Sequence, residues 1–280
     1  MQHRTKTVLV AAAATVVATV LAGCGAATAT SNVTADCTPA DTLTTITGGT
    51  LTVTLAALPP FVTADGSTVG GIDGEILTAF AEEQCLTVTG TPVATAAVIP
   101  AVQTGRSDVA AGSWWRSASR AEIVGLTGPI YLDQMAYISE EGFSSLSEME
   151  GKPVGTVDGY LWTAEAKAYF GDALKVYKST PDMYNDLTAG RIDVAMDSFG
   201  SGSFNAPDFA VEVAEPDPAI GASLEAPQTT FPVSLDNPEL LAALDSFIVA
   251  MREDGRLAEI LEAHGLPASA ADTGEPRLIE

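Results

Sequence analysis

The chain has 280 residues, of which 46% are hydrophobic and 18% charged, so it is long enough for one core or two small lobes. Asp and Glu number 36 against 13 Lys and Arg, and the formal net charge is -23 at pH 7. So acidic a surface repels a phosphate backbone, which excludes nucleic acid as the partner. The 2 histidines argue against histidine catalysis and against a histidine-rich metal site, and we expect no metal and no cofactor.

The N-terminus has the pattern of an export signal. Residues 1–7 are basic, and residues 8–20 form an apolar run too short to span a bilayer. Leu21-Ala22-Gly23-Cys24 follows and resembles a bacterial lipobox, in which cleavage before the cysteine frees it to carry lipid. We expect residues 1–23 to be a lipoprotein signal peptide and Cys24 to anchor the protein at the extracytoplasmic face of the cell membrane. An ordinary signal peptide with a chance cysteine is the alternative.

The first residues of the mature chain predict a tether and a disulfide. Residues 24–49 are rich in Ala, Thr and Ser without periodicity, which indicates a flexible tether. With Cys24 lipidated, Cys37 and Cys85 remain as a pair in an oxidising compartment. Each precedes an expected strand, and adjacent parallel strands bring such ends together. We expect a disulfide between them, with two free thiols as the alternative.

Strand and helix signals alternate along the rest of the chain, which predicts parallel sheets covered by helices. The expected strands are residues 50–56, 86–89, 109–111, 135–138, 154–157, 174–177, 194–196 and 231–233. The expected helices are residues 71–84, 98–104, 161–170, 181–189, 238–254 and 257–264, with Pro100 in the first turn of the second. Residues 199–228 are predicted to be irregular, and residues 268–280 a loose tail.

An internal echo favours two lobes of similar build. Gly105-Arg106-Ser107-Asp108-Val109-Ala110 matches Gly190-Arg191-Ile192-Asp193-Val194-Ala195 at all positions but one. Each copy is expected to hold a helix end, a glycine cap and a buried strand, although such turns also recur by chance. The echo aligns Gly112 with Asp197, which directly follow their strands. Ligands of open α/β sheets bind beyond the carboxyl ends of the strands, so both should face a cleft between the lobes.

Aromatic and basic side chains follow the third strand at once. Gly112 and Ser113 lead into Trp114-Trp115, with Arg116 and Arg120 close behind. A guanidinium offers paired donors to a carboxylate, and bulky aromatic rings suit an apolar part of a ligand. This stretch is therefore predicted to be one wall of a site for a small ligand with an apolar and an anionic part.

Several short pieces of the chain stand in a recognisable order and spacing. They are Pro59-Pro60-Phe61, Gly71-Ile72-Asp73-Gly74-Glu75-Ile76, residues 99–108, residues 120–124, Gly128-Pro129-Ile130-Tyr131, residues 146–152, Val154-Gly155-Thr156 and residues 237–257. Together they resemble the family 3 extracellular solute-binding proteins of amino-acid ABC importers. The resemblance spans residues 50–267. It implies a two-lobed α/β fold of the periplasmic-binding-protein-like type II, with two crossing hinge strands and a ligand cleft between the lobes. Lobe 1 would be residues 50–131 plus 229–267, and lobe 2 residues 132–228.

The resemblance also implies roles for single residues. Arg120 holds the place of the arginine that grips the ligand carboxylate, with Arg116 as a competitor. Asp197 holds the place of the acid that takes the ligand's amino group. The further implied contacts are stacking by Phe61 and polar groups from Gly112 and Ser113. The plainer interpretations are a surface arginine, a turn cap at Asp197 and a core role for Phe61.

The chain departs from the family at its aromatic residues. Trp114 and Trp115 stand where the family usually has small hydroxyl residues, and the lobe 2 turn is Gly159-Tyr160, followed by Trp162. Each aromatic residue alone is more often a core residue than a site residue. Together they predict an aromatic-lined pocket, which would suit an aromatic ligand, or a cationic ligand through cation–π contact.

The function implied is that of a lipid-anchored substrate-binding protein of an ABC importer, expected to be a monomer. It would capture an amino acid or related zwitterion and deliver it to a membrane permease. The alternative is a secreted enzyme on the same fold, similar to cyclohexadienyl dehydratases, with Glu165 or Asp197 as acid or base. We expect a binding protein, because the sequence has no nucleophile elbow, phosphate loop or cysteine–histidine pair, and His264 is interpreted as a helix cap.

Overall fold

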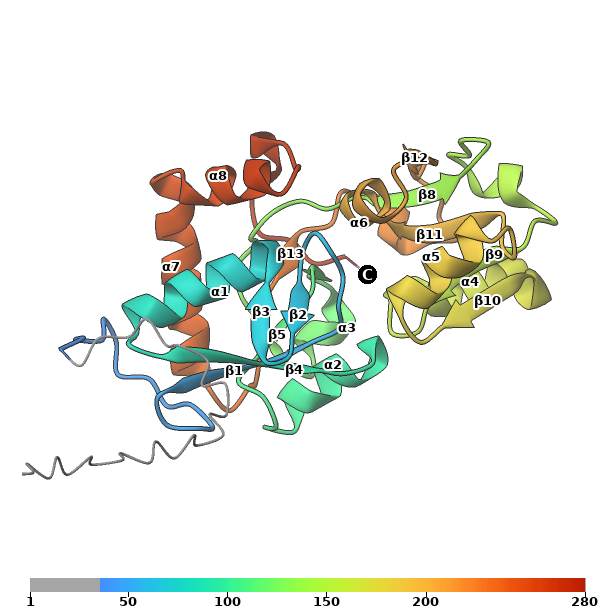
Figure 1. Ribbon diagram of the computed structural model, residues 1–280. Helices are drawn as coiled ribbons and strands as arrows, with labels where there is room; N and C mark the ends of the chain where they lie inside the picture. The colour runs from blue at the N-terminus through green and yellow to red at the C-terminus, as the bar shows by residue number, and fades with distance from the viewer. Residues whose placement is uncertain (1–35, 280) are drawn as a thin grey trace, which may run out of the picture. The chain divides into compact units, whose positions relative to one another are not determined.

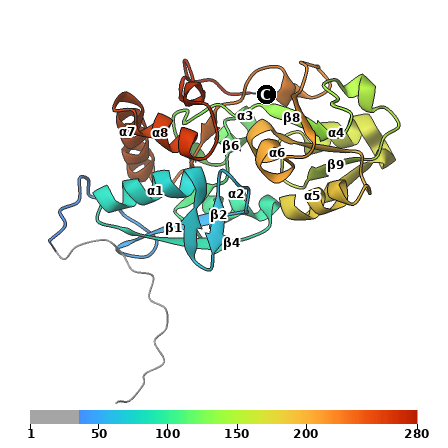
Figure 2. The ribbon, with the colours of Figure 1, turned by 45° about the horizontal axis from the view of Figure 1, so that its top comes forward.

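The computed structural model describes residues 36–279. The expected signal peptide, Cys24 and the first part of the tether lie outside the described residues. Within residues 36–279, no helix combines the length and the apolar character that crossing a membrane requires. Two five-stranded sheets form the framework, and each carries helices of its own (Figures 1 and 2). The parts around the first and second sheets are called lobe 1 and lobe 2 below.

Lobe 1 contains a sheet with the strand order β4-β1-β5-β14-β7. Its strands are β1 (Thr50–Leu55), β4 (Thr87–Pro92), β5 (Val109–Ala111), β7 (Gly125–Leu126) and β14 (Pro232–Val233). β1 is parallel to β4 and β5, whereas β14 is antiparallel to β5 and β7. Parallel neighbours need crossover connections, and α1 (Gly71–Glu83) and α2 (Thr95–Gln103) supply them. A hairpin of β2 (Thr63–Asp65) and β3 (Thr68–Gly70) precedes α1.

Two further helices complete lobe 1. They are α7 (Pro238–Glu253) and α8 (Arg256–Ala263). α7 begins as the sequence predicts, because Asn237 caps it by accepting the Leu240 N–H at 3.2 Å and Pro238 takes the first position. Its apolar face enters the core, where Phe247 packs edge-to-face on Phe80 of α1 with ring centroids 5.5 Å apart.

Lobe 2 contains a sheet with the strand order β10-β9-β11-β8-β12. Its strands are β8 (Met135–Ser139), β9 (Val154–Val157), β10 (Leu174–Tyr177), β11 (Val194–Ser198) and β12 (Ala210–Val213). β9 is parallel to β10 and β11, and β8 is antiparallel to β11 and β12. The helices are α4 (Thr163–Phe170), α5 (Thr180–Thr188) and α6 (Phe199–Asn205), with short 3-10 turns η1 (Leu146–Met149), η2 (Gly171–Ala173) and η3 (Gly221–Ser223).

The chain passes between the two sheets twice. The first passage leads into β8, the second leads back to β14, and the two meet in a β-bridge between Leu132 and Gln228. Next to this bridge, β13 (Thr229–Thr230) pairs with β6 (Trp114–Trp115), and the short α3 (Ala118–Ala121) follows β6. The crossing segments therefore run directly beside the stretch that carries the tryptophans and Arg120.

The disulfide between Cys37 and Cys85 is present, with the Cα atoms 5.8 Å apart, which confirms that prediction. The described part of the expected tether is not free. The Asp41 N–H donates to Gln84 Oε1 at 2.9 Å, and the Ile46 N–H donates to Asp108 Oδ1 at 2.9 Å. Residues 36–49 are thus held on lobe 1, because main-chain groups there find fixed acceptors that a composition-based interpretation does not reveal.

Several element boundaries differ from the predictions. α2 begins at Thr95, so Pro100 lies inside the helix, where packing of the buried residues around it overrides the local preference. β11 extends to Ser198, so Asp197 lies within the strand instead of after it. The segment predicted to be irregular holds α6 and β12, and β12 is an edge strand whose stability comes from pairing with β8.

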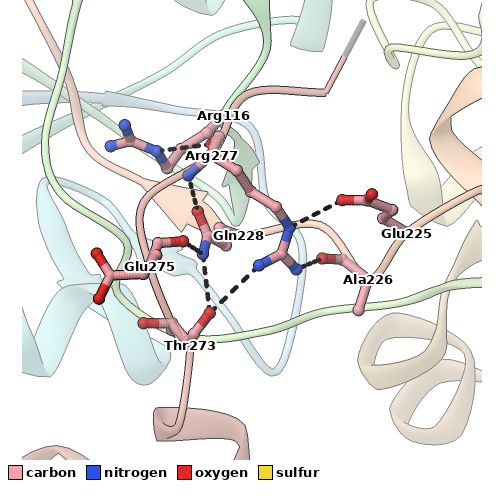
Figure 3. A network of polar contacts seen from close by, with 7 residues as sticks. All are labelled: Arg116, Glu225, Ala226, Gln228, Thr273, Glu275 and Arg277. Atoms are coloured by element: carbon pink, nitrogen blue, oxygen red, sulfur yellow. Dashed lines mark hydrogen bonds and ion pairs between the residues drawn. The ribbon is translucent and has the colours of Figure 1, made fainter.

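The C-terminal residues are ordered, contrary to the expected loose tail. η4 (Ala268–Ala271) packs its buried alanines on lobe 1. Beyond it, hydrogen bonds tie residues 273–277 to Gln228 of the second crossing segment (Figure 3). Ile279 accepts the Ala118 N–H at the start of α3. These residues are fixed by hydrogen bonds to partners far away in the sequence. Their own sequence has no apolar pattern from which this order could be predicted.

Candidate functional site

A pocket that is partly open to solvent lies where both lobes and the first crossing segment meet. Lobe 1 contributes residues 111–115 and Arg120, lobe 2 contributes residues 160–162 and Asp197, and the crossing segment contributes Asp133. The strand ends aligned by the internal echo, at Gly112 and Asp197, therefore lie in the same pocket.

Arg120 is a half-buried cation at the pocket wall. It lies on α3, whose N-cap residue Ser117 accepts the Arg120 N–H at 3.3 Å. Its Nη1 donates to the Trp115 carbonyl at 2.8 Å, and its Cζ lies 4.8 Å from the Trp114 ring centroid. Within residues 36–279 it forms no ion pair, and burial lowers its pKa to about 10, so it stays charged at neutral pH. An anionic ligand group in the pocket would supply the missing partner.

Arg116 does not line the pocket. Its Nη1 donates to the Thr127 carbonyl, and its Nε donates to the Arg277 carbonyl at 3.2 Å. Of the two arginines that the sequence left in competition, Arg120 is the one that lies in the pocket wall. Arg116 instead joins lobe 1 to the C-terminal residues.

Asp197 provides a buried carboxylate on the opposite lobe. Its Oδ2 accepts hydrogen bonds from Tyr184 Oη at 3.0 Å and from Ser201 Oγ at 2.8 Å, and its Oδ1 accepts the Ser198 N–H at 2.8 Å. Burial raises its pKa to about 6 although these bonds favour the charged form. A cationic ligand group would stabilise the ionised carboxylate at this place.

Asp133 is a second buried acid in the pocket, which the sequence analysis missed. Its Oδ2 accepts Ser113 Oγ of lobe 1 at 2.9 Å, and its Oδ1 accepts the Gly200 N–H of lobe 2 at 3.4 Å. Burial raises its pKa to about 7, and the nearby charge of Asp197 adds to the rise. The available signal was its position, two residues after the Gly128–Tyr131 motif, where the chain leaves lobe 1.

The turn after β5 is held by a buried carboxylate of α1. Asp73 Oδ2 accepts the N–H groups of Gly112 at 2.7 Å and of Ser113 at 3.0 Å, while Tyr131 Oη donates to Oδ1 at 2.8 Å. Ser113 has φ 52°, a left-handed conformation that non-glycine residues rarely adopt. Asp73 thus holds a strained turn that aims Ser113 at Asp133.

Four aromatic residues line the pocket as predicted by sequence position: Trp114, Trp115, Tyr160 and Trp162. Trp115 of lobe 1 lies 5.0 Å from Trp162 of lobe 2, centroid to centroid, and Tyr160 packs edge-to-face on Trp162 at 5.0 Å. The Trp162 Nε1–H donates to Thr156 Oγ1 at 2.9 Å, which fixes the ring. The aromatic wall is therefore continuous across the two lobes.

Two predicted ligand contacts lie beside the pocket and do not line it. Phe61 is fully buried and stacks on Tyr131 with centroids 5.7 Å apart, so its plainer interpretation as a core residue applies. Gly200 of lobe 2 lies against it, since a Cβ there would be 2.4 Å from Phe61 Cζ. Gly159, with φ 90°, lies equally close to the backbone of Ala96, since a Cβ there would be 2.8 Å from Ala96 Cα. Both predicted contacts therefore belong to the junction between the lobes.

The residues considered for catalysis divide between pocket and periphery. Glu165 does not line the pocket, and its Oε2 accepts the Gly221 N–H at 3.1 Å. His264 Nε2 lies 2.8 Å from Glu75 Oε1 within lobe 1. Within residues 36–279, no group of His, Cys, Asp and Glu side chains is arranged to hold a metal ion.

Comparison with known families identifies the chain. The model of the bacterial extracellular solute-binding proteins, family 3, matches residues 51–266. The chain belongs to this family. A comparison with curated protein sequences finds no significant match.

Solved structures of similar fold include several binding proteins. The amino acid ABC transporter substrate-binding protein AbpA from Streptococcus pneumoniae, bound to L-arginine, is 22% identical, with a TM-score of 0.68 over 80% of this chain and 96% of that chain. A mutant of ArgBP from T. maritima is 18% identical, with a TM-score of 0.69 over 77% and 95%. The ancestral amino acid-binding protein AncCDT-1, a precursor of cyclohexadienyl dehydratase, is 20% identical, with a TM-score of 0.68 over 77% and 95%.

At these identities the likeness shows the fold, which is the two-lobed, type II periplasmic-binding-protein-like fold. In this family 3 solute-binding protein the family match ends at residue 266. The ordered C-terminal residues, including the acceptor for Arg116, therefore lie outside the matched range.

Proposed function

We propose that the protein is a lipid-anchored receptor that captures an amino acid or related zwitterion and delivers it to an ABC permease in the membrane. The observation that carries this proposal is the pairing of Arg120 on lobe 1 with buried carboxylates opposite it. A ligand with a carboxylate and an ammonium group satisfies Arg120 and Asp197 together. The binding proteins of similar fold, one bound to L-arginine and one to histidine, support this class of ligand.

The charges in the pocket favour a cationic amino acid within that class. The pocket wall holds one guanidinium, that of Arg120, and two carboxylates, those of Asp133 and Asp197. With both acids ionised, these side chains carry one net negative charge, which a ligand with one net positive charge would balance. The aromatic wall would hold the side chain of such a ligand through apolar and cation–π contacts.

The direct test is a melting-temperature panel of amino acids, their betaines and small acids, measured on the purified chain from Gly25 onward. Binding to the native state alone raises the melting temperature, by the equivalent of about 2.7 kcal/mol at a hundredfold excess over Kd. We expect the largest rise with cationic amino acids and none in Arg120→Ala. A panel without any rise would contradict the receptor function.

Membrane anchoring and transport are separate steps of the proposal. Anchoring depends on Cys24, so a labelled fatty acid should be incorporated into the full-length chain and not into Cys24→Ala. Uptake of the bound amino acid by the native cells should fall in the same variant. Incorporation that persists without Cys24 would contradict the anchor.

A dehydratase on the same fold is the second candidate function. The observation that favours it is Asp133, a pocket carboxyl whose pKa of about 7 suits proton transfer near neutral pH. The fold of the dehydratase precursor AncCDT-1 is also similar. The test is whether the protein consumes an added cyclohexadienyl substrate. Consumption by the unchanged chain that is absent in Asp133→Asn would support the enzyme and replace the receptor proposal.

A further inference from the structure

Residues 273–279 form a segment, called the C-terminal strap here, that is organised around Gln228. This buried side chain lies in the second crossing segment, 1% exposed. Its Nε2 donates to the carbonyls of Thr273 and Glu275, both at 2.8 Å, and its Oε1 accepts the Arg277 N–H at 2.8 Å (Figure 3). One amide side chain therefore fixes the strap at three successive points.

Arg277 adds a second set of contacts between the strap and the crossing segment. Its Nη2 donates to the Ala226 carbonyl, and its Nε lies 3.2 Å from Glu225 Oε2 (Figure 3). The Arg277 carbonyl accepts Arg116 Nε at 3.2 Å, while the Arg116 N–H donates to the Gln228 carbonyl at 2.8 Å. Arg116 is thus held by the strap and by the crossing segment together.

Ile279 brings the strap onto the stretch that carries the site. The Ile279 N–H donates to the Arg116 carbonyl at 3.0 Å, and the Ile279 carbonyl accepts the Ala118 N–H at 2.9 Å. Its side chain is 7% exposed and belongs to the apolar cluster that includes Trp115 and Trp162. The strap therefore pairs like a short strand with the residues between Trp115 and α3.

These contacts surround the groups that hold Arg120 in the pocket. Ser117 lies between the two residues bonded to Ile279, and its Oγ accepts the Arg120 N–H. The Trp115 carbonyl, just before them, accepts Arg120 Nη1. α3 has four residues, and a helix that short does not hold its own geometry in water. Its position depends on what its N-terminal side is fastened to.

We propose that the C-terminal strap is a positioning element of the ligand site, which fastens residues 115–118 and thereby aims Arg120 at the ligand carboxylate. The part concerning the ligand rests on the proposed function. The strap lies beyond residues 51–266, which match the family. Without it, Arg120 would keep its charge and lose its fixed direction, and recognition of the carboxylate would weaken most.

The first test needs no ligand. Amide hydrogen exchange of residues 116–121 is compared between the intact chain, a chain ending at Pro276, and Ile279→Pro, which removes the N–H bonded to Arg116. Ile279→Val keeps that donor, and Leu278→Ala changes an exposed side chain, 44% exposed, so both serve as matched controls. We expect exchange at least about tenfold faster than in the intact chain for the chain ending at Pro276 and for Ile279→Pro. In the two controls we expect the exchange rate of the intact chain. Unchanged exchange in both test variants would overturn the proposal.

The second test separates positioning from general stability. The probes are L-arginine, which fits the pocket charge, and L-argininamide, which lacks the carboxylate. We expect the ratio of their dissociation constants to shrink by about tenfold in the chain ending at Pro276 and in Ile279→Pro, and to stay constant in the controls. A lowered melting temperature with an unchanged ratio would show a merely structural strap and overturn the proposal. If the intact chain binds no amino acid of the panel, both the proposed function and the part of the inference that concerns the ligand are wrong. The exchange result still decides whether the strap holds residues 116–121.

Discussion

At the scale of single residues, the central feature of the site is a guanidinium held without a carboxylate partner among the described residues. Arg120 is half-buried, packs against Trp114 and donates a hydrogen bond to the Trp115 carbonyl, so the protein fixes its place and leaves its charge uncompensated there. A buried charge costs free energy unless a partner offsets it. A binding protein meets that condition when the partner is the ligand.

We therefore predict that Arg120→Lys raises the dissociation constant for an amino-acid ligand by about tenfold to a hundredfold. Lysine keeps the charge and loses the paired donors that match a carboxylate. Isothermal titration calorimetry measures the change, with Arg106→Lys at an exposed position of lobe 1 as the control. Equal affinity of the two variants for the ligand would show that Arg120 does not bind the ligand carboxylate.

The two pocket acids make stability and binding depend on pH in opposite ways. Burial raises the pKa of Asp133 to about 7 and that of Asp197 to about 6, against an ordinary value of 3.8. The folded protein then holds protons that the unfolded chain releases. Their contribution to stability is therefore present at low pH and lost as the pH rises through about 6 to 7. A cationic ligand group reverses this, because it stabilises the ionised acids.

For Asp133→Asn we predict that the melting temperature, relative to the unchanged chain, rises between about pH 4 and pH 7, because asparagine never ionises. Affinity of the unchanged chain for a cationic amino acid should increase over the same range, and this increase should be smaller in the variant. Asp236→Asn, at an exposed position, is the control. A pH profile shared by all three chains would show that Asp133 does not titrate in the pocket.

At the scale of elements, two glycines of lobe 2, Gly159 and Gly200, let the lobes approach beside the pocket. A Cβ at Gly159 would lie 2.8 Å from Ala96 Cα, whereas a Cβ at Gly171 would meet nothing within 4 Å, although both glycines have positive φ. We predict that Gly159→Ala weakens ligand binding by about tenfold or more, and that Gly171→Ala shares only the backbone strain, about 1 kcal/mol. Calorimetric titration of both variants decides this, and equal affinities would show that the contact with Ala96 does not matter for binding.

The disulfide ties the segment before β1 to the end of α1. It closes a loop with a sequence separation of 48, which the chain-entropy model converts to about 4 kcal/mol of stability. We predict that replacing Cys37 and Cys85 with serine lowers the unfolding free energy by roughly that amount, measured by urea denaturation. Addition of a reductant should lower the stability of the unchanged chain equally and leave the variant unaffected. A variant as stable as the unchanged chain would contradict this.

Elements with a strong local pattern could be predicted from the sequence. β5, β9 and β10 have the predicted bounds, and α7 begins at the predicted cap. α6 and β12 could not be predicted, since β12 is stabilised by its partner strand and carries little pattern of its own.

The site could be predicted in the same uneven way. Arg120, Asp197 and the aromatic residues could be placed because they lie at or shortly after the carboxyl ends of strands. The position of Asp133 depends on where the chain crosses between lobes, which no spacing fixes. The C-terminal strap could not be predicted either, because its hydrogen bonds join residues that lie about 50 to 160 positions apart in the sequence.

At the scale of the whole molecule, the site couples the two lobes. Arg120 comes from lobe 1 and Asp197 from lobe 2, so one ligand with both charges bonds to both lobes only when they are close. The net charge of -23 adds a long-range field that attracts cationic solutes and weakens with salt. The proposed capture by closure around a small charged molecule therefore rests on the distribution of charge as well as on the fold.

The most direct measurement is a crystal structure of the protein with L-arginine. We predict that the carboxylate of the bound molecule lies within hydrogen-bond distance of the Arg120 guanidinium, about 2.7–2.9 Å, and that its ammonium group lies at Asp197. Density for the amino acid outside the pocket, or a carboxylate that contacts neither Arg120 nor its neighbours, would contradict the proposed site.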